Sequence, residues 1–207
     1  MGQAVNRERN RPKDLRHSSP FTIHGLTPYF MPMRAVARQN APPAVAKSPR
    51  LETLTWPEAE AILTPETVVM IPLGAASKEH GPHLKLRNDL TLADYLTGRV
   101  ADSTPVVVAP ALPYHFYPAF LEYPGSTSLT LATARDMTAE VVRTLAGYGP
   151  RRFYIVNTGI STVRALEPAA AALTADGVLM RYTNLSRFDV AMKVMIEQQG
   201  GSHADEV

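Results

Sequence analysis

The chain has 207 residues, a formal net charge of +2 and no cysteine, and 45% of its residues are hydrophobic. This length and composition are typical of one globular domain, and the lack of cysteine excludes disulfides, thiol nucleophiles and thiolate metal ligands. No apolar run approaches the roughly 18 residues that span a bilayer, so we expect no membrane-spanning segment.

The first 50 residues differ in composition from the rest of the chain. They hold nine Lys or Arg residues, two acidic residues and seven prolines. We expect residues 1–50 to be a disordered, basic, proline-rich leader and residues 51–207 to form the folded domain. The basic residues lack the interleaved aromatic residues of a nucleic-acid surface, so we expect no nucleic-acid partner. No unbroken apolar stretch resembles a secretory signal, which predicts a cytoplasmic protein, or an exported one if the start codon is assigned wrongly.

From residue 51 onward, strand and helix patterns alternate. Apolar, β-branched runs predict buried strands at 68–73, 106–112, 153–157 and 178–183. Helices are predicted from Thr55, at 90–100, at 134–147 behind a cap at Thr133, at 161–175 and at 185–199. This alternation predicts an α/β fold with three α/β/α layers and a mostly parallel sheet.

Ligands of such sheets bind beyond the carboxyl ends of the strands, and the first strand is followed by residues suited to chemistry. Glu79, His80, His83 and Asp89 lie within eleven residues there. Without cysteine, a metal would need His, Asp or Glu, a ligand set that suits zinc or manganese. Spacing alone leaves another interpretation open, in which Asp89 caps a helix and the histidines are polar loop residues.

The segment 71–94 resembles the metal-site segment of the creatininase-like amidohydrolases. The matching stretches are IPLG at 71–74 and EHGPHL at 79–84, followed by Asp89 nine residues after the first His. Further similar stretches follow in the family's order: LPY at 112–114, EYPGSTSL at 122–129 and GGSHADEV at 200–207. The resemblance therefore covers all of the chain except the leader.

This resemblance implies a homo-oligomeric hydrolase of a small cyclic amide or related C–N compound. A water activated by one or two zinc or manganese ions would attack the amide carbon. Matching positions imply His80, Asp89 and Glu206 as metal ligands, with Asp89 bridging, and His203 as proton donor. Glu79 would be the catalytic carboxylate, and the substrate would contact Lys78, His83, Ser161 and Thr162.

The sequence departs from the family pattern at three places. Lys78 stands where the family has Glu, so Glu79 can substitute only if the loop bulges. Gly159 stands where the family has a ligand His, and the C-terminal motif stops at Val207, as expected of a divergent, C-terminally truncated member.

These departures leave a rival hypothesis from another class of protein. The turn at 157–162 offers backbone N–H groups and the hydroxyls of Ser161 and Thr162, which suit a small anion. An ordinary cap of the following helix by Ser161 or Thr162 is the favoured interpretation of these hydroxyls. The rival is thus a non-catalytic relative that binds a small anionic ligand near Lys78, and an inactive fragment is the third possibility.

Overall fold

The computed structural model describes residues 48–187, and all that follows concerns this part of the chain. Its parallel sheet has four strands in the order β2-β1-β3-β4. The strands are β1 (Val68–Leu73), β2 (Val107–Val108), β3 (Arg152–Asn157) and β4 (Leu179–Tyr182). The helices are α1 (Trp56–Ile62), α2 (Asn88–Ala101), α3 (Leu131–Ala146) and α4 (Val163–Ala175), with 3-10 turns η1 (Leu51–Thr53) and η2 (Leu185–Arg187).

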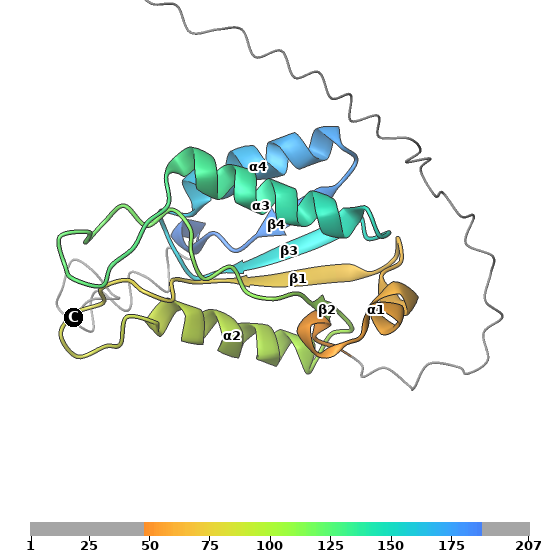
Figure 1. Cartoon of the computed structure of the whole chain (residues 1–207), viewed down its shortest axis with the longest axis horizontal. Helices are drawn as coiled ribbons and strands as arrows, with labels where there is room; N and C mark the ends of the chain where they lie inside the picture. Colours follow the sequence, from red (N-terminus) through yellow and green to blue (C-terminus); the bar gives the residue numbers. More distant parts are fainter. Residues whose placement is uncertain (1–47, 188–207) are drawn as a thin grey trace, which may run out of the picture. The chain divides into compact units, whose positions relative to one another are not determined.

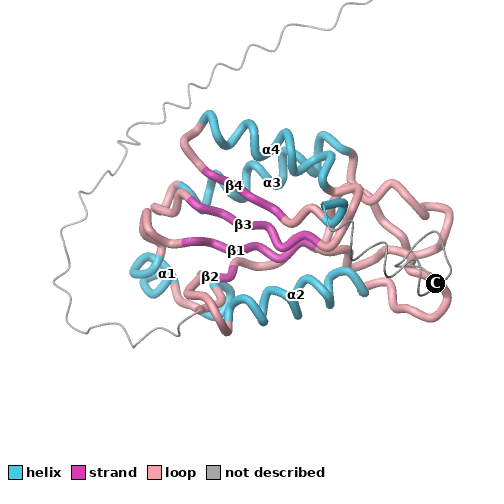
Figure 2. Tube along the Cα trace, turned by 180° about the vertical axis from the view of Figure 1, so that it is seen from behind, coloured by secondary structure: helices cyan, strands magenta, loops and turns pink. Residues whose placement is uncertain are grey.

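Helices cover both faces of this sheet. Helix α2 lies on one face, and α3 and α4 lie together on the other (Figures 1 and 2). This arrangement confirms the predicted three-layer α/β/α fold with a mostly parallel sheet. None of the helices in residues 48–187 combines the length and apolar character needed to cross a membrane.

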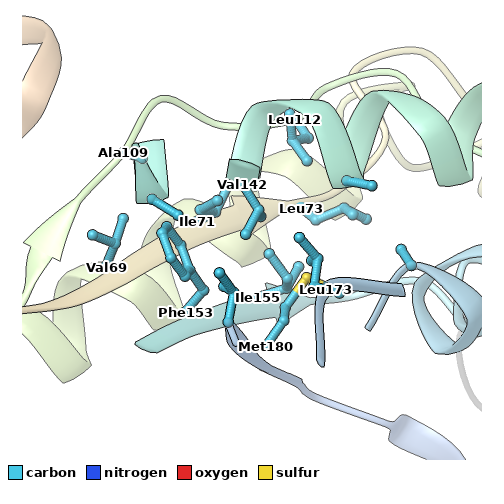
Figure 3. Close-up of a cluster of buried hydrophobic side chains, with 14 of the residues drawn as sticks. Val69, Ile71, Leu73, Ala109, Leu112, Val142, Phe153, Ile155, Leu173 and Met180 are labelled. Carbon is cyan, nitrogen blue, oxygen red and sulfur yellow. The ribbon is translucent and has the colours of Figure 1, made fainter. Parts of the chain in front are cut away.

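Strand β1 buries both of its faces, as its continuous apolar run predicts, whereas β3 is exposed at Arg152 and Tyr154. Alternate residues of β1, among them Ile71, pack with Val142 of α3 and Leu173 of α4 (Figure 3). Met70 points the other way, into a second cluster with Val108 and Val156. This period of two follows from strand geometry, in which successive side chains leave opposite faces.

Several predicted boundaries shift in the structure. The strand predicted at 106–112 is regular only at Val107–Val108, because Pro110 has no N–H for a ladder. The chain still follows β1 beyond it, since Leu112 donates its N–H to the carbonyl of Pro72 (2.8 Å). The helix predicted at 134–147 begins at Leu131, and Thr130, not Thr133, caps it by accepting the Thr133 N–H (3.1 Å).

The two ends of the described part also bear on the predicted domain limits. Arg50 forms a parallel bridge with Val108, and the Val108 N–H donates to the carbonyl of Pro49 (2.9 Å), so the last residues of the predicted leader lie against β2. Of the helix predicted at 185–199, only Leu185–Arg187 is described, as a 3-10 turn. The rest of that prediction lies outside the described residues.

Gly74 sets the distance between the end of β1 and the first turn of α2. A Cβ added there would contact the carbonyl of Asp89 and lie 2.8 Å from the backbone nitrogen of Leu90. Only glycine permits this approach, which the hydrogen bond from Leu90 N–H to the Ala75 carbonyl (3.2 Å) also holds. The beginning of α2 is thereby fixed against the end of the central strand.

We predict that Ile155→Ala lowers the free energy of unfolding by about 2–5 kcal/mol, because it opens a cavity at a fully buried position of β3. Urea unfolding measures this loss. Leu179→Ala, at a position that is 44% exposed on β4, is the control, with an expected change of about 0.5 kcal/mol. Equal losses in the two variants would contradict the proposed core.

We also predict that Gly74→Ala destabilises the fold by about 1–3 kcal/mol, because backbone atoms of α2 must move to admit the methyl group. The control is Gly98→Ala within α2, where an added Cβ meets nothing within 4 Å. Alanine there should stabilise the helix by up to about 1 kcal/mol. A Gly74→Ala protein as stable as wild type in thermal unfolding would show that this contact is loose.

Candidate metal centre

The candidate site lies where β1 and β3 end. Leu73 pairs with Asn157 in the ladder, and the Thr158 N–H donates to the Leu73 carbonyl (3.1 Å). The segments that follow these strands therefore begin side by side, as expected for ligand-binding loops of a parallel sheet. The hydroxyl of Thr158 donates to the Asp89 carbonyl (2.9 Å), which ties the first turn of α2 to the same edge.

Asp89 occupies the second position of α2 and does not cap it. The residue that precedes the helix is Arg87, and no side chain there makes a capping hydrogen bond. The interpretation of Asp89 as a helix cap is therefore wrong. Its carboxylate is almost buried, and its Oδ1 lies 2.9 Å from Nε2 of His80.

The buried ring of His80 has one nitrogen paired and one not. Nδ1 lies 2.8 Å from the Lys78 carbonyl. Because a carbonyl only accepts, Nδ1 carries hydrogen, and in a neutral ring Nε2 is left with its lone pair. Nε2 is close enough to Asp89 for an ion pair, yet it lacks the alignment of a hydrogen bond and has no hydrogen-bond partner in the described part.

This unpaired nitrogen fits a metal ligand. In a neutral ring, Nε2 and Oδ1 are two electron-pair donors that face each other at 2.9 Å, and a cation satisfies both. The Lys78 carbonyl fixes the tautomer and the ring orientation, as second-shell partners of metal-bound histidines do. An imidazole and a carboxylate suit zinc or manganese.

The described part supplies these two ligands and no complete set. Within residues 48–187, no three His, Cys, Asp or Glu side chains gather closely enough to hold a metal ion. The two other predicted residues of the centre, His203 and Glu206, lie outside this part.

The remaining residues of the 78–83 loop have other contacts. Oε1 of Glu79 accepts the Gly81 N–H (2.5 Å), and the Glu79 N–H donates to Ser126 Oγ (3.0 Å), so its carboxylate shapes the loop. The ammonium of Lys78 lies 5.3 Å from the ring centre of Phe120. The side chain of His83 is exposed to solvent.

The hydroxyls after β3 are paired within the protein. Ser161 Oγ donates to the Phe116 carbonyl (3.0 Å). Thr162 Oγ1 lies 2.7 Å from both Asn157 Oδ1 and the Gly159 carbonyl, and its side chain does not cap α4. The Gly159 N–H is also used, because it donates to Asn157 Oδ1 (3.1 Å).

Two buried aromatic residues at this end of the sheet were not singled out by sequence reasoning. Burial lowers the pKa of His115 to about 4, so its ring is neutral at physiological pH, and its Nε2 lies 3.0 Å from Thr138 Oγ1. Burial, and then the negative charge of Asp89, raise the pKa of Tyr117 well above its ordinary value. Both residues follow Leu112, beyond the end of a predicted strand, where ligand-binding residues are expected. Aromatic residues in such a segment are equally typical of a hydrophobic core, so the sequence did not distinguish the two roles.

Comparison with known proteins agrees with this fold. Residues 52–207 match the family described as Creatininase, creatinine amidohydrolase. A creatinine amidohydrolase from Pseudomonas putida is 33% identical over 119 residues, covering 55% of this chain and 45% of the relative. A mycofactocin precursor peptide peptidase from Mycolicibacterium smegmatis is 28% identical over 116 residues, covering 53% and 46%. The chain thus matches less than half the length of these curated relatives.

Solved structures show the same likeness. The crystal structure of a creatinine amidohydrolase (creatininase) superposes with a TM-score of 0.63 at 27% identity, covering 77% of this chain and 67% of that one. The match to a manganese creatininase covers 76% of this chain and 67% of that one. The match to a zinc-zinc creatininase variant covers 75% of this chain and 66% of that one. Each has a TM-score of 0.61 and 27% identity. Because the family match spans well over half of its residues, the chain belongs to the creatininase family and has that family's amidohydrolase fold.

Proposed function

We propose that the protein is a metal-dependent amidohydrolase that hydrolyses a C–N bond in a small cyclic amide or a related compound. The observation that carries the proposal is the buried pair of His80 Nε2 and Asp89 Oδ1. These two electron-pair donors lie 2.9 Å apart with no hydrogen bond between them. A bound zinc or manganese ion would supply a water with a lowered pKa as the nucleophile. The manganese and zinc forms among the similar structures support this choice of ion.

The protein's part in this chemistry is to hold its ligands in place before the ion arrives. His80 is oriented by the Lys78 carbonyl, and Asp89 is fixed by the contact of α2 with Gly74 and Thr158. Neither ligand has a long, flexible side chain, so binding of the ion would require little further ordering of the protein. The departure at Lys78 leaves the orientation of His80 intact, because the Lys78 backbone carbonyl holds the ring whatever side chain this residue carries.

The rest of the centre is proposed from the family resemblance. Glu206 would complete the ligand set for one or two ions, and His203 would deliver a proton to the leaving nitrogen. Glu79 would serve as a catalytic carboxylate through Oε2, because Oε1 accepts the Gly81 N–H. His83, which is exposed, and Lys78 would meet the incoming substrate.

The names of the curated relatives support the proposed substrate class. One is named a creatinine amidohydrolase and the other a peptide peptidase, and both names denote cleavage of an amide bond. We therefore propose an amide substrate, with small cyclic amides first and short peptides as the alternative to be assayed beside them.

The rival hypothesis, a non-catalytic anion-binding relative, has less support. It uses donors in the turn after β3, where the hydroxyls of Ser161 and Thr162 and the Gly159 N–H are paired within the protein. An anion would have to displace these bonds, which lowers its affinity.

We also propose that the protein is a homo-oligomer. Four large side chains of α2 are 39–55% exposed along its length: Leu92, Tyr95, Leu96 and Val100. An apolar strip of this kind on a helix suits contact with a second copy. A cytoplasmic location and the lack of a nucleic-acid partner stay predictions.

Metal binding tests the proposal. Protein purified without chelators should contain zinc or manganese by mass spectrometry, and zinc titrated into apoprotein should bind in a calorimeter. His80→Ala and Asp89→Ala should each weaken that binding by more than the roughly 10- to 100-fold cost of changing a second-shell residue. Asp136→Ala removes a carboxylate that is exposed on α3 and should bind zinc as wild type does.

Metal-free protein that neither binds zinc nor gains thermal stability from it would sink the proposal. So would equal losses in Asp89→Ala and Asp136→Ala, because they would indicate adventitious binding to surface carboxylates.

A further inference from the structure

Tyr117 is a buried residue whose polar group lacks a partner. Its side chain is 2% exposed, and its hydroxyl makes no hydrogen bond within residues 48–187. A buried hydroxyl without a partner is disfavoured, and such groups in native proteins call for an explanation. A purely packing role would be served better by phenylalanine, so the hydroxyl points to a ligand as its partner.

The ring of Tyr117 lies at the same end of the sheet as the His80–Asp89 pair. Its Cε1 is 3.5 Å from the position that a Cβ on Gly159 would take, so the ring stands beside the turn after β3. Thr158, the preceding residue, donates to the Asp89 carbonyl, and burial and then the Asp89 charge raise the pKa of Tyr117. Three segments therefore converge here: the loop after β1, the turn after β3 and residues 115–117.

The backbone around Tyr117 is held from both sides. Its own N–H donates to Ser128 Oγ (2.9 Å), and the carbonyl of Phe116 accepts from Ser161 Oγ (3.0 Å). The His115 carbonyl accepts the Leu129 N–H (2.8 Å). A donor on so constrained a segment is pre-organised, as groups that bind developing charge in active sites are.

We propose that the Tyr117 hydroxyl donates a hydrogen bond to the carbonyl oxygen of an amide ligand held at the His80–Asp89 pair. This inference rests on the proposed function and adds a substrate-binding residue to it. A phenol carries one O–H, which can donate a hydrogen bond to a carbonyl oxygen.

The test uses the full-length, zinc-loaded protein and acetohydroxamate, a small probe whose carbonyl oxygen accepts hydrogen bonds while the molecule binds zinc. Tyr117→Phe keeps the ring and removes the hydroxyl. Calorimetry should show acetohydroxamate binding weakened by roughly 2- to 10-fold, the range for a hydrogen bond between neutral groups. Zinc affinity should be unchanged, and thermal stability should be equal or higher, because the variant removes an unpaired buried group.

Tyr114→Phe is the matched control, since Tyr114 lies on the same segment but is 50% exposed. It should bind acetohydroxamate as wild type does.

Unchanged acetohydroxamate affinity in Tyr117→Phe would overturn this inference and leave the metal site standing. A loss of zinc affinity equal to the loss of acetohydroxamate affinity would also overturn it, because it would make Tyr117 a ligand of the ion. If wild-type protein fails to bind zinc, the proposed function fails, and the role of Tyr117 fails with it.

Discussion

The close approach of Gly74 to the first turn of α2 is the constraint on which the candidate site depends. It brings the backbone of Asp89 against the end of β1, and Thr158, just after β3, donates its hydroxyl to the same Asp89 carbonyl. Once α2 begins there, the Asp89 carboxylate meets the ring of His80 beyond the strand. The pairing of Leu73 with Asn157 then adds the turn after β3 to the same edge. Sheet register, one glycine and one helix start thus determine which polar groups face one another.

The fold and the central pair of this site could be predicted because their signals are local. Continuous β-branched runs identify β1 and β3, and His80 and Asp89 stand a few residues beyond β1 in a spacing with few alternatives. Sequence reasoning was weaker where tertiary contacts decide. Pro110 shortens β2, and Thr130 caps α3 in place of the predicted Thr133. The hydroxyl of Ser161 donates to the carbonyl of Phe116, 45 residues away.

Tyr117 illustrates a further reason why part of the site escaped prediction. A tyrosine in an aromatic-rich segment after a strand is ordinary core material, and its importance comes from a hydroxyl that finds no partner. The ring lies beside Gly159, 42 residues away in the sequence, where an added Cβ would be 3.5 Å from Cε1. Lys78 shows the reverse case. Its side chain departs from the family pattern, while its backbone carbonyl orients His80.

The most direct test is a crystal structure of the protein grown with zinc, with anomalous diffraction recorded at the zinc edge. We predict an anomalous peak within bonding distance of both His80 Nε2 and an Asp89 carboxylate oxygen, roughly 2.0–2.2 Å from each. Nδ1 of His80 should remain on the Lys78 carbonyl. A zinc-free centre in which His80 and Asp89 form an ordinary hydrogen bond, with the anomalous signal confined to the surface, would contradict a metal centre.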